Sequence, residues 1–545
     1  MTIWKLGCSW GDRSQAPVFY DLLKKYSIVI CNSEPKIHRG DYVALAKGFD
    51  IFALAIILKD VEPASNHQEL KSDFEEYDIG FDDSYIAKAK IFELNDSDHI
   101  WYQQQKSGRK ISKEKILKQI KKLIYKMENE ETTNKIIGLL KSNYNVILTG
   151  APGTGKTYRA KEVAASIIGC ETKDLGKNHQ YGFVQFHPSY DYTDFVEGLR
   201  PLKSKESKDI TFELKDGVFK KFCERALRNS DSYLFHSYYK GWIDKIEASD
   251  SKKITLNLKS EHSHQFSYTK NNGGFVLSSQ EENDHEDYNI TKEQLFKFFM
   301  KYHTLSSLLK DNDAIKNMKE ELKGEKEKLA SFYWAILKEM LPDTYENQNS
   351  DKYVFVIDEI NRGELSKIFG ELFFSIDPDY RGKIGAVQTQ YANLQEKPNA
   401  FDEVLDVNEG DYGHFFVPEN VYIIGTMNDI DRSVESMDFA MRRRFSWKEI
   451  TADDSMLMLD NYFEGDELRK VQNRMKNLND EILKIPGLSS AYQIGGAYFK
   501  KYKKYHDFDE LWNNHLRGLL YEYLRGNRDI DSRLVQLKVA YDNEN

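Results

Sequence analysis

The chain has 545 residues, which is enough for about three or four domains. Hydrophobic residues make up 40% of it and aromatic residues 13%, so it can fill several cores and wholesale disorder is excluded. The net charge of −10 excludes a generally basic nucleic-acid coat, but not a local basic groove. Four scattered cysteines without a C-x-x-C pair indicate neither a disulfide framework nor a zinc site, and favour the cytoplasm. No signal peptide or run of about 20 apolar residues is found, so no membrane partner is expected.

Residues 1–110 contain short β-type runs separated by turn residues, which predicts a small β-barrel. The runs are "YSIVICN", "DYVALAKG", "IFALAIILKD" and "YIAKAKIFEL". The pattern resembles PUA-like domains of the EVE type, some of which read modified bases. A base flipped out of a duplex is held by aromatic stacking and edge hydrogen bonds. The candidate residues for a base pocket are therefore Trp4, Trp10, Phe19, Tyr20 and Trp101. Packing in the core of the domain is the alternative for each of them.

A strongly basic segment, "KSGRKISKEKILKQIKKLIYK", follows at residues 106–126. Ile116, Ile120 and Ile124 recur at helical spacing, which predicts a linker helix over about 111–135 with one apolar face. Its lysines either form a solvated face or contact the phosphate backbone of DNA in support of the preceding domain. The sequence leaves both interpretations open.

A phosphate-binding loop is indicated by "NVILTGAPGTGKTYRAKEVAASII". A short apolar strand leads into Gly-x-x-x-x-Gly-Lys-Thr and then into a helical pattern, which is the order that the Walker A motif requires. Glycines let backbone N–H groups close around phosphate oxygens, and the helix N-terminus favours their negative charge. Lys156 is expected to reach the β- and γ-phosphates and Thr157 to ligate Mg²⁺. The predicted nucleotide-binding residues are Gly150, Pro152, Gly153, Thr154, Gly155, Lys156, Thr157 and Tyr158.

The span from about 228 to 350 predicts a small α+β insertion. "KKITLNLKS" and "HQFSYTKNNGGFVLSS" are typical of strands, and two later stretches are typical of helices. The charged helix face is expected to be solvated, with contact to a partner or to DNA as the alternative.

A second motif, "KYVFVIDEINRGELSKIFGELFF", begins as a buried strand and ends in two carboxylates. This is the Walker B pattern, in which one carboxylate supports Mg²⁺ and the next polarises the attacking water. Asp358 takes the first role and Glu359 the second. The motif gains weight from the complete Walker A that precedes it.

A third motif, "IIGTMNDIDRSVESMDFAMRRRF", again follows a core strand. In a parallel sheet, Asn428 then lies beside the γ-phosphate, where an amide can orient the attacking water. Arg443 and Arg444 end the next predicted helix, where cations are favoured in any protein. In a ring this position faces the neighbour's nucleotide, so we expect at least one arginine to act in trans.

These motifs resemble the McrB family of AAA+ NTPases, the motor subunits of modification-dependent restriction systems. The matching segments are "GAPGTGKT", "FVQFHPSYDYTDFVEGLRP", "VFVIDEINRGELSKIFGEL" and "FFVPENVYIIGTMNDIDRSVESMDFAMRRRF", with Met427, Asn428 and Asp431 as the Met-Asn-x-x-Asp signature. The resemblance implies that Asp431 supports the signature loop and that residues 451–545 form a helical lid and tail. The family more often has His where this chain has Gly496, so no lid residue is assigned. It also implies a hexameric ring, Mg²⁺ and either GTP or ATP. Because the chain shows no nuclease motif, the resemblance implies a separate McrC-like endonuclease.

The sequence thus predicts an α/β AAA+ core over 136–450, preceded by a reader of modified DNA and followed by a lid. The expected function is nucleotide hydrolysis that drives a nuclease in restriction or antiphage defence. One alternative is a MoxR- or dynein-related remodelling ATPase with protein clients and no DNA. Another is a regulatory scaffold that binds nucleotide without turnover, which the presence of Glu359 and Asn428 disfavours.

Overall fold

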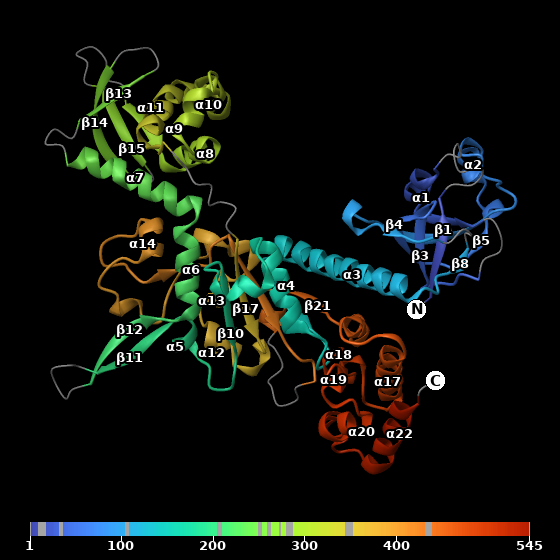
Figure 1. Cartoon of the computed structure of the whole chain (residues 1–545). Helices are drawn as coiled ribbons and strands as arrows, with labels where there is room; N and C mark the ends of the chain where they lie inside the picture. Colours follow the sequence, from blue (N-terminus) through green and yellow to red (C-terminus); the bar gives the residue numbers. More distant parts are fainter. Residues whose placement is uncertain are drawn as a thin grey trace. The chain divides into compact units, whose positions relative to one another are not determined.

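The computed structural model describes residues 2–8, 18–31, 36–103, 108–203, 210–248, 253–258, 263–271, 274–279, 287–343, 352–430 and 439–543. The chain forms two compact units (Figure 1). The first comprises residues 1–135, 150–155 and 450–545, and the second comprises residues 136–149 and 156–449. Within the described ranges, no helix is both long enough and apolar enough to cross a bilayer.

The N-terminal part of the first unit is a mixed sheet. Its strands run in the order β2-β6-β4-β3-β1-β8, and only the β1–β3 pair is parallel. The expected closed PUA-like barrel is not confirmed, because the described strands form an open path whose end strands do not pair with each other. The elements are β1 (Ile3–Gly7), α1 (Tyr20–Tyr26), β2 (Ile28–Cys31), β3 (Tyr42–Lys47), β4 (Asp50–Ile57), β5 (Glu62–Pro63), α2 (Lys71–Glu76), β6 (Tyr85–Glu93), β7 (Ile100–Trp101) and β8 (Arg109–Lys110).

A single long helix, α3 (Glu114–Asn143), leads out of this sheet. Ile116, Ile120 and Ile124 are buried in one cluster with Ile3 and Ile111, so the apolar face predicted from their spacing packs on the N-terminal sheet. The helix is uninterrupted, and its last residues, from 136 onward, belong to the second unit and directly precede β9.

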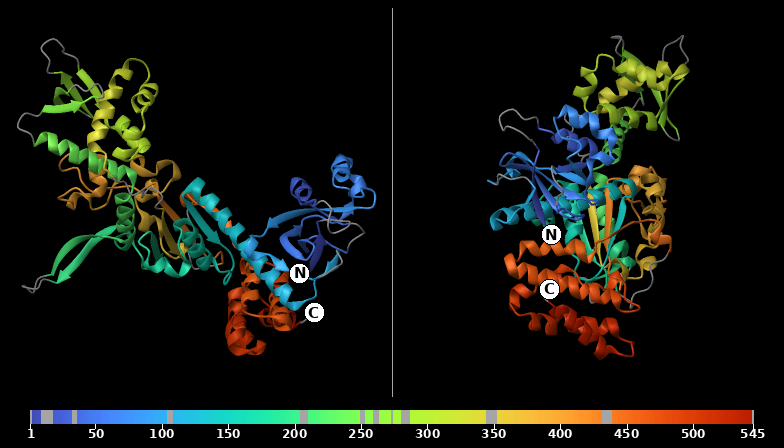
Figure 2. Two further views of the ribbon diagram at one scale, coloured as in Figure 1. Left: turned by 45° about the horizontal axis from the view of Figure 1, so that its top comes forward. Right: turned by 90° about the vertical axis from the view of Figure 1, so that its right-hand side faces the viewer.

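The C-terminal part of the first unit is helical. Its longest helix, α17 (Gly465–Lys484), packs against α22 (Ile530–Asp542), as Figure 2 shows. The other helices are α16 (Ala452–Met456), α18 (Gly496–Phe499), α19 (Tyr502–Tyr505), α20 (Phe508–Leu511) and α21 (Arg517–Leu524).

The second unit is built on a five-stranded parallel sheet, which confirms the predicted α/β core. Its order is β10-β17-β20-β9-β21, so strands distant in sequence lie side by side (Figure 2). The three central strands read as near-continuous apolar runs and are almost entirely buried, as expected for parallel strands covered on both faces. Their bounds are β9 (Asn145–Thr149), β10 (Tyr181–Gln185), β17 (Tyr353–Asp358), β20 (Val421–Thr426) and β21 (Ser446–Glu449). Helices of this core include α4 (Lys156–Ile168), α5 (Tyr192–Phe195), α6 (Val218–Arg228), α12 (Leu365–Phe369), α13 (Leu372–Ser375), α14 (Ala400–Leu405) and α15 (Phe439–Arg442).

A β-hairpin and an α+β insertion extend this core. A two-stranded hairpin of β11 (Glu197–Lys203) and β12 (Ile210–Asp216) extends away from it (Figure 1). Between α6 and β17 lies an α+β insertion with a separate hydrophobic core and an antiparallel sheet. Helices cover one face of that sheet (Figures 1 and 2), which explains why Ile254 and Leu256 are buried while the alternate residues are exposed. Its elements are α7 (Asp231–Glu247), β13 (Lys253–Asn257), β14 (Ser263–Asn271), β15 (Gly274–Ser279), β16 (Asp287–Thr291), α8 (Lys292–Tyr302), α9 (Leu305–Lys310), α10 (Ala314–Leu322) and α11 (Ala330–Met340).

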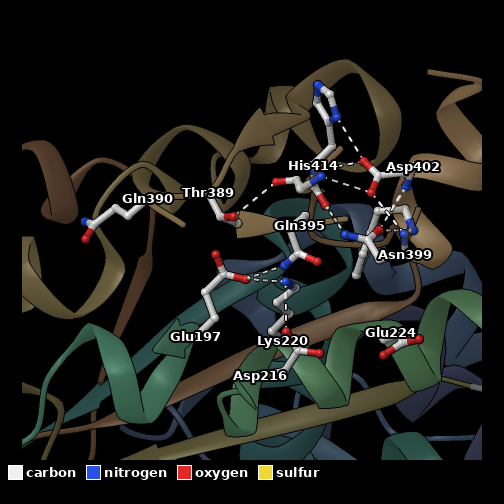
Figure 3. Close-up of polar contacts among 12 residues, drawn as sticks. Glu197, Asp216, Lys220, Glu224, Thr389, Gln390, Gln395, Asn399, Asp402 and His414 are labelled. Atoms are coloured by element: carbon white, nitrogen blue, oxygen red, sulfur yellow. Dashed lines mark hydrogen bonds and ion pairs between the residues drawn. The ribbon is translucent and has the colours of Figure 1, made fainter. Parts of the chain in front are cut away.

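The base of the hairpin is held by a buried ion pair. The Lys220 ammonium on α6 contacts the carboxylate of Glu197, and both side chains are almost fully buried (Figure 3). Lys220 also lies 2.8 Å from Asp216, and Gln395 donates to Glu197 at 3.5 Å. Burial alone would lower the pKa of Lys220, but the two carboxylates outweigh it and raise that pKa. The hairpin is thus tied at both strands to one helix.

Replacing Lys220 by Met should leave the Glu197 carboxylate buried without its cation. We expect the free energy of unfolding to fall by about 3–5 kcal/mol, the usual cost of breaking a buried pair. Urea denaturation followed by tryptophan fluorescence measures this. The double variant Lys220→Met/Glu197→Gln should recover part of the loss; equal loss in both variants would contradict a charge-based explanation.

Candidate nucleotide-hydrolysis site

The loop between β9 and α4 has the backbone that a phosphate cradle needs. Gly150, Gly153 and Gly155 have φ values of 140°, 79° and 87°, which side-chain-bearing residues rarely adopt. A Cβ at Gly150 would lie 2.2 Å from the carbonyl oxygen of Ile450, so no side chain fits at this position. Thr154 donates its hydroxyl to the Ala151 carbonyl at 3.0 Å and stiffens the loop. The loop runs directly into α4, whose N-terminal N–H groups favour anions.

Part of the C-terminal helical region, where the sequence predicts a lid, packs directly on this loop within the first unit. The backbone N–H of Gly495 donates to the Pro152 carbonyl at 2.9 Å, and that of Ala497 donates to Gly153 at 3.0 Å. A Cβ at Gly153 would meet the ring of Tyr498 at 2.6 Å. These lid residues were not assigned from the sequence, because their role depends on an approach between segments more than 300 residues apart.

The neighbouring Gly496, which is not the histidine that the resemblance would predict, lies in a closely packed place. A Cβ at Gly496 would lie 2.5 Å from the Ser455 carbonyl oxygen, so no side chain fits there. The Gly496 N–H also donates to the Ser455 hydroxyl at 2.9 Å. The position is a tight packing contact in this lid.

The first turn of α4 places a cation and a hydroxyl beside the carboxyl ends of the parallel strands. Lys156 is buried and Thr157 half-buried, whereas Tyr158 is exposed. The Thr157 hydroxyl donates to Oδ1 of Asp358 at 2.6 Å. Thr426, the last residue of β20, donates to the same oxygen, also at 2.6 Å. Hydroxyl and carboxylate oxygens converging in this way are ligands that Mg²⁺ accepts, so these residues fit the metal expected from the sequence.

Glu359 adopts a backbone conformation that costs energy for a residue with a side chain. Its φ and ψ are 51° and 46°, in the left-handed region. Asn428 donates its amide to Glu359 Oε1 at 2.9 Å, and the Arg362 guanidinium lies 3.3 Å from Oε2. The Glu359 N–H donates to the Thr426 hydroxyl at 3.3 Å. Such strain, held by several partners, is typical of a residue kept in a functional orientation.

Two of these partners, Thr426 and Arg362, were missed by the sequence analysis. Thr426 directly precedes the Met-Asn pair at the end of a predicted core strand. Its place at the strand end was the available signal, because carboxyl ends of parallel strands meet at one edge of the sheet. Arg362 follows Glu359 by three residues, which brings the two together in the single turn after β17.

The arginines lie near the amino ends of the parallel strands, opposite the carboxyl ends that carry Asp358 and Thr426. Arg443 and Arg444 precede β21, whose first residue, Ser446, pairs with Val146 near the start of β9. Thr149, at the far end of β9, leads toward the phosphate loop. Four strand steps separate Asn145 from Thr149, or about 13 Å at the usual rise per residue. The arginines of a subunit therefore lie far from its own Asp358 and Thr426.

The two arginines differ in their surroundings. Arg444 is only 7% exposed; its Nη1 donates to the Ala440 carbonyl at 2.6 Å, and its Nε lies 3.6 Å from Asp377. Arg443 is exposed, and its side chain makes no ion pair or hydrogen bond with another described residue. Asp431 lies outside the described residues.

The candidate base-pocket residues do not share one environment. Trp4, Phe19 and Tyr20 are buried in the hydrophobic core of the N-terminal sheet, where Trp4 also donates its indole N–H to Asp41 at 3.0 Å. Trp101 is 70% exposed and stands edge-on to Phe49, with ring centroids 5.5 Å apart. Trp10 lies outside the described residues. Of the described candidates, Trp101 presents an open aromatic face.

Comparisons with known proteins agree with this architecture. The model of the AAA domain of the dynein-related subfamily matches residues 288–445. The Type IV methyl-directed restriction enzyme EcoKMcrB subunit of Escherichia coli K12 is 26% identical over 376 residues, 68% of this chain and 50% of the relative. The Type II restriction enzyme BsuMI component YdiS of Bacillus subtilis 168 is 25% identical over 204 residues, 35% of this chain and 51% of the relative. The chain thus spans about half the length of these relatives. Together these matches support a McrB-like AAA+ NTPase.

Replacing Glu359 by Gln should block turnover while leaving nucleotide binding intact, because the amide keeps the shape but cannot accept a proton. We expect kcat to fall by about 10²- to 10⁴-fold, the usual contribution of a general base. Lys156→Ala provides the contrast, since it should abolish tight binding itself. Steady-state hydrolysis and equilibrium titration with a fluorescent nucleotide separate the two effects. Unchanged turnover in the Glu359→Gln variant would remove the base role.

Proposed function

We propose that this McrB-like AAA+ protein hydrolyses GTP or ATP at the interfaces of a ring, most simply a hexamer, formed by its own copies. Its N-terminal domain binds DNA, and the natural target is modified DNA. Nucleotide hydrolysis then drives a separate McrC-like endonuclease in restriction or antiphage defence. The observation that carries the proposal is the separation of the two halves of the chemistry. Carboxylates and hydroxyls lie at one edge of the parallel sheet, and the arginines lie at the other.

The residues of one subunit would divide the reaction as follows. The loop at 150–155 and Lys156 bind the phosphates, with Pro152, Gly153, Thr154 and Tyr158 flanking them. Thr157 and Asp358 would hold Mg²⁺, which supplies charge neutralisation on the phosphates when bound. Glu359 takes a proton from the attacking water, and Asn428 holds the Glu359 carboxylate and orients that water. Asp431 supports the loop that carries Asn428.

The remaining charge is neutralised by the neighbouring subunit. Arg443 is the better candidate for this role because its side chain is exposed, whereas Arg444 is buried against its own subunit. We assign Arg444 to holding the segment in place and Arg443 to the neighbour's nucleotide. An arginine supplied in trans is worth about 10³- to 10⁵-fold in turnover in related chemistry.

Mixed rings test this arrangement. Arg443→Ala subunits keep an intact hydrolysis site, and Glu359→Gln subunits keep an intact arginine. Each variant alone should be nearly inactive. A one-to-one mixture should regain turnover at about a quarter of its interfaces, since random mixing pairs a sound site with a sound arginine that often.

The matched control is Arg442→Ala, which removes an exposed arginine one residue away. Arg442 lies over the Trp447 ring at 5.2 Å, and we expect its loss to be tolerated. A mixture whose activity is only the sum of its parts would contradict action in trans.

DNA reading by the N-terminal domain has support from two features. Trp101 offers an exposed aromatic face beside Phe49, and stacking on such a face is worth about 1–3 kcal/mol per base. Exposed Lys47, Arg109 and Lys110 lie on the same sheet. Both relatives are named as restriction enzymes, one of them methyl-directed.

The lysines of α3 contribute less to this surface than their number in the sequence indicates. Lys118, Lys121 and Lys126 pair with Glu464, Asp460 and Asp98 respectively. The solvated-face interpretation therefore accounts for part of the basic segment.

Trp101→Ala should weaken duplex binding by about 5- to 150-fold, the affinity equivalent of losing one stacked base. Fluorescence anisotropy with methylated and plain duplexes measures the effect. Tyr521→Ala, which removes an exposed aromatic in the lid, is the control. The second candidate function is a remodelling ATPase with protein clients, which the dynein-related family model favours. No affinity for any duplex in the unaltered protein would select that candidate.

A further inference from the structure

The junction between α3 and the sheet is marked by two asparagines. Asn143 ends α3, Asn145 begins β9, and Tyr144 between them has a φ of 55°, which turns the chain from helix to strand. Both asparagines belong to the second unit, as do the arginines. Asn145 is completely buried, whereas Asn143 is half-buried.

Both side chains donate to the same backbone oxygen. The amide of Asn145 lies 2.8 Å from the Arg444 carbonyl, and that of Asn143 lies 3.2 Å from it. Asn145 also donates to the Ile376 carbonyl at 2.7 Å. The Arg381 guanidinium, itself buried, donates to the Asn145 side-chain oxygen. Because guanidinium only donates and carbonyls only accept, the orientation of this buried amide is fixed.

These contacts hold the arginine segment from its backbone. Arg444 is fixed at its carbonyl by the asparagines and at its side chain by Ala440 and Asp377. Arg443 is the next residue toward the N-terminus, so the position of its exposed side chain depends on where Arg444 is held. Neither asparagine lies near Thr157 or Asp358, which are at the other edge of the sheet.

We propose that Asn143 and Asn145 are positioning residues that hold the Arg442–Arg444 segment in the place from which Arg443 reaches the neighbouring subunit. The inference rests on the proposed action of Arg443 in trans. Because Asn143 is the last residue of α3, one end of the clamp is part of the helix that begins at the N-terminal domain.

The test uses Asn143→Asp, which keeps the size of the side chain but replaces the donor by an acceptor facing a carbonyl. We expect kcat to fall by about 10- to 100-fold, as for a catalytic group displaced by about 1 Å. Nucleotide affinity should change by less than about twofold, since the phosphate-binding residues are not touched. Ser142→Ala is the control, because its hydroxyl bonds only within α3 among the described residues. Asn143→Gln, which retains the amide donor, should keep more turnover than Asn143→Asp.

Mixing with Glu359→Gln subunits then separates positioning from a general loss of structure. Those subunits carry an intact clamp and arginine, so they should restore turnover at the sound sites of Asn143→Asp subunits. Unchanged turnover in Asn143→Asp, or a loss that Glu359→Gln subunits do not restore, would overturn the clamp. If the mixture of Arg443→Ala and Glu359→Gln restores turnover while the Asn143→Asp mixture does not, only the clamp is wrong. If neither mixture restores it, the trans arrangement itself is wrong.

Should Asn143→Asp fail to fold, Asn143→Ala is measured in the same mixtures. It removes the donor without placing a charge beside the Arg444 carbonyl. The same two outcomes decide for or against the clamp.

Discussion

One oxygen atom of Asp358 organises the candidate site, because it accepts hydrogen bonds from two hydroxyls on two different elements. Thr157 reaches it from the first turn of α4, and Thr426 reaches it from the end of β20. Hydroxyl and carboxylate oxygens that converge in this way are ligands that Mg²⁺ accepts. The contact thus joins the phosphate-binding helix, the Walker B strand and the strand before Asn428 at one point.

The direction of the parallel strands also separates this contact from the arginines. Every carboxyl end lies at the edge that carries Asp358 and Thr426, and every amino end lies at the edge that carries the arginines. In our proposal a subunit binds the phosphates and polarises the attacking water with its own residues. Its own Arg443, however, lies near the opposite ends of the strands. This separation is the physical reason why we propose a ring, in which a second copy supplies the cation, over an isolated enzyme.

The sequence predicts those residues of the candidate site that lie together in one strand–loop–helix segment. Lys156, Thr157, Asp358 and Glu359 belong to such segments, so their order along the chain already indicates their roles. Thr426 and Arg362 carry only weaker local signals, the end of a strand and a spacing of three residues from Glu359. Tyr498 meets the phosphate loop only in the folded chain. The buried α/β core was predictable for the same reason, since its strands are long apolar runs.

The N-terminal domain shows where such inference ends. Trp4, Phe19 and Tyr20 were candidates because a base pocket and a hydrophobic core both require aromatic residues. Burial separates the two uses, and burial depends on how the sheet closes, which short β-type runs do not determine. The open strand path leaves Trp101 at the surface and the other three in the core. Composition identifies aromatic residues as candidates but does not determine the face on which each lies.

The helix α3 joins the N-terminal sheet to the strand β9 of the parallel sheet. Its first turns are buried against the N-terminal sheet through Ile116 and Ile120, and its last residue contacts the backbone of Arg444. Its 30 residues form one uninterrupted helix. If Asn143 positions the arginine segment as proposed, α3 is the covalent path from the N-terminal sheet to that segment.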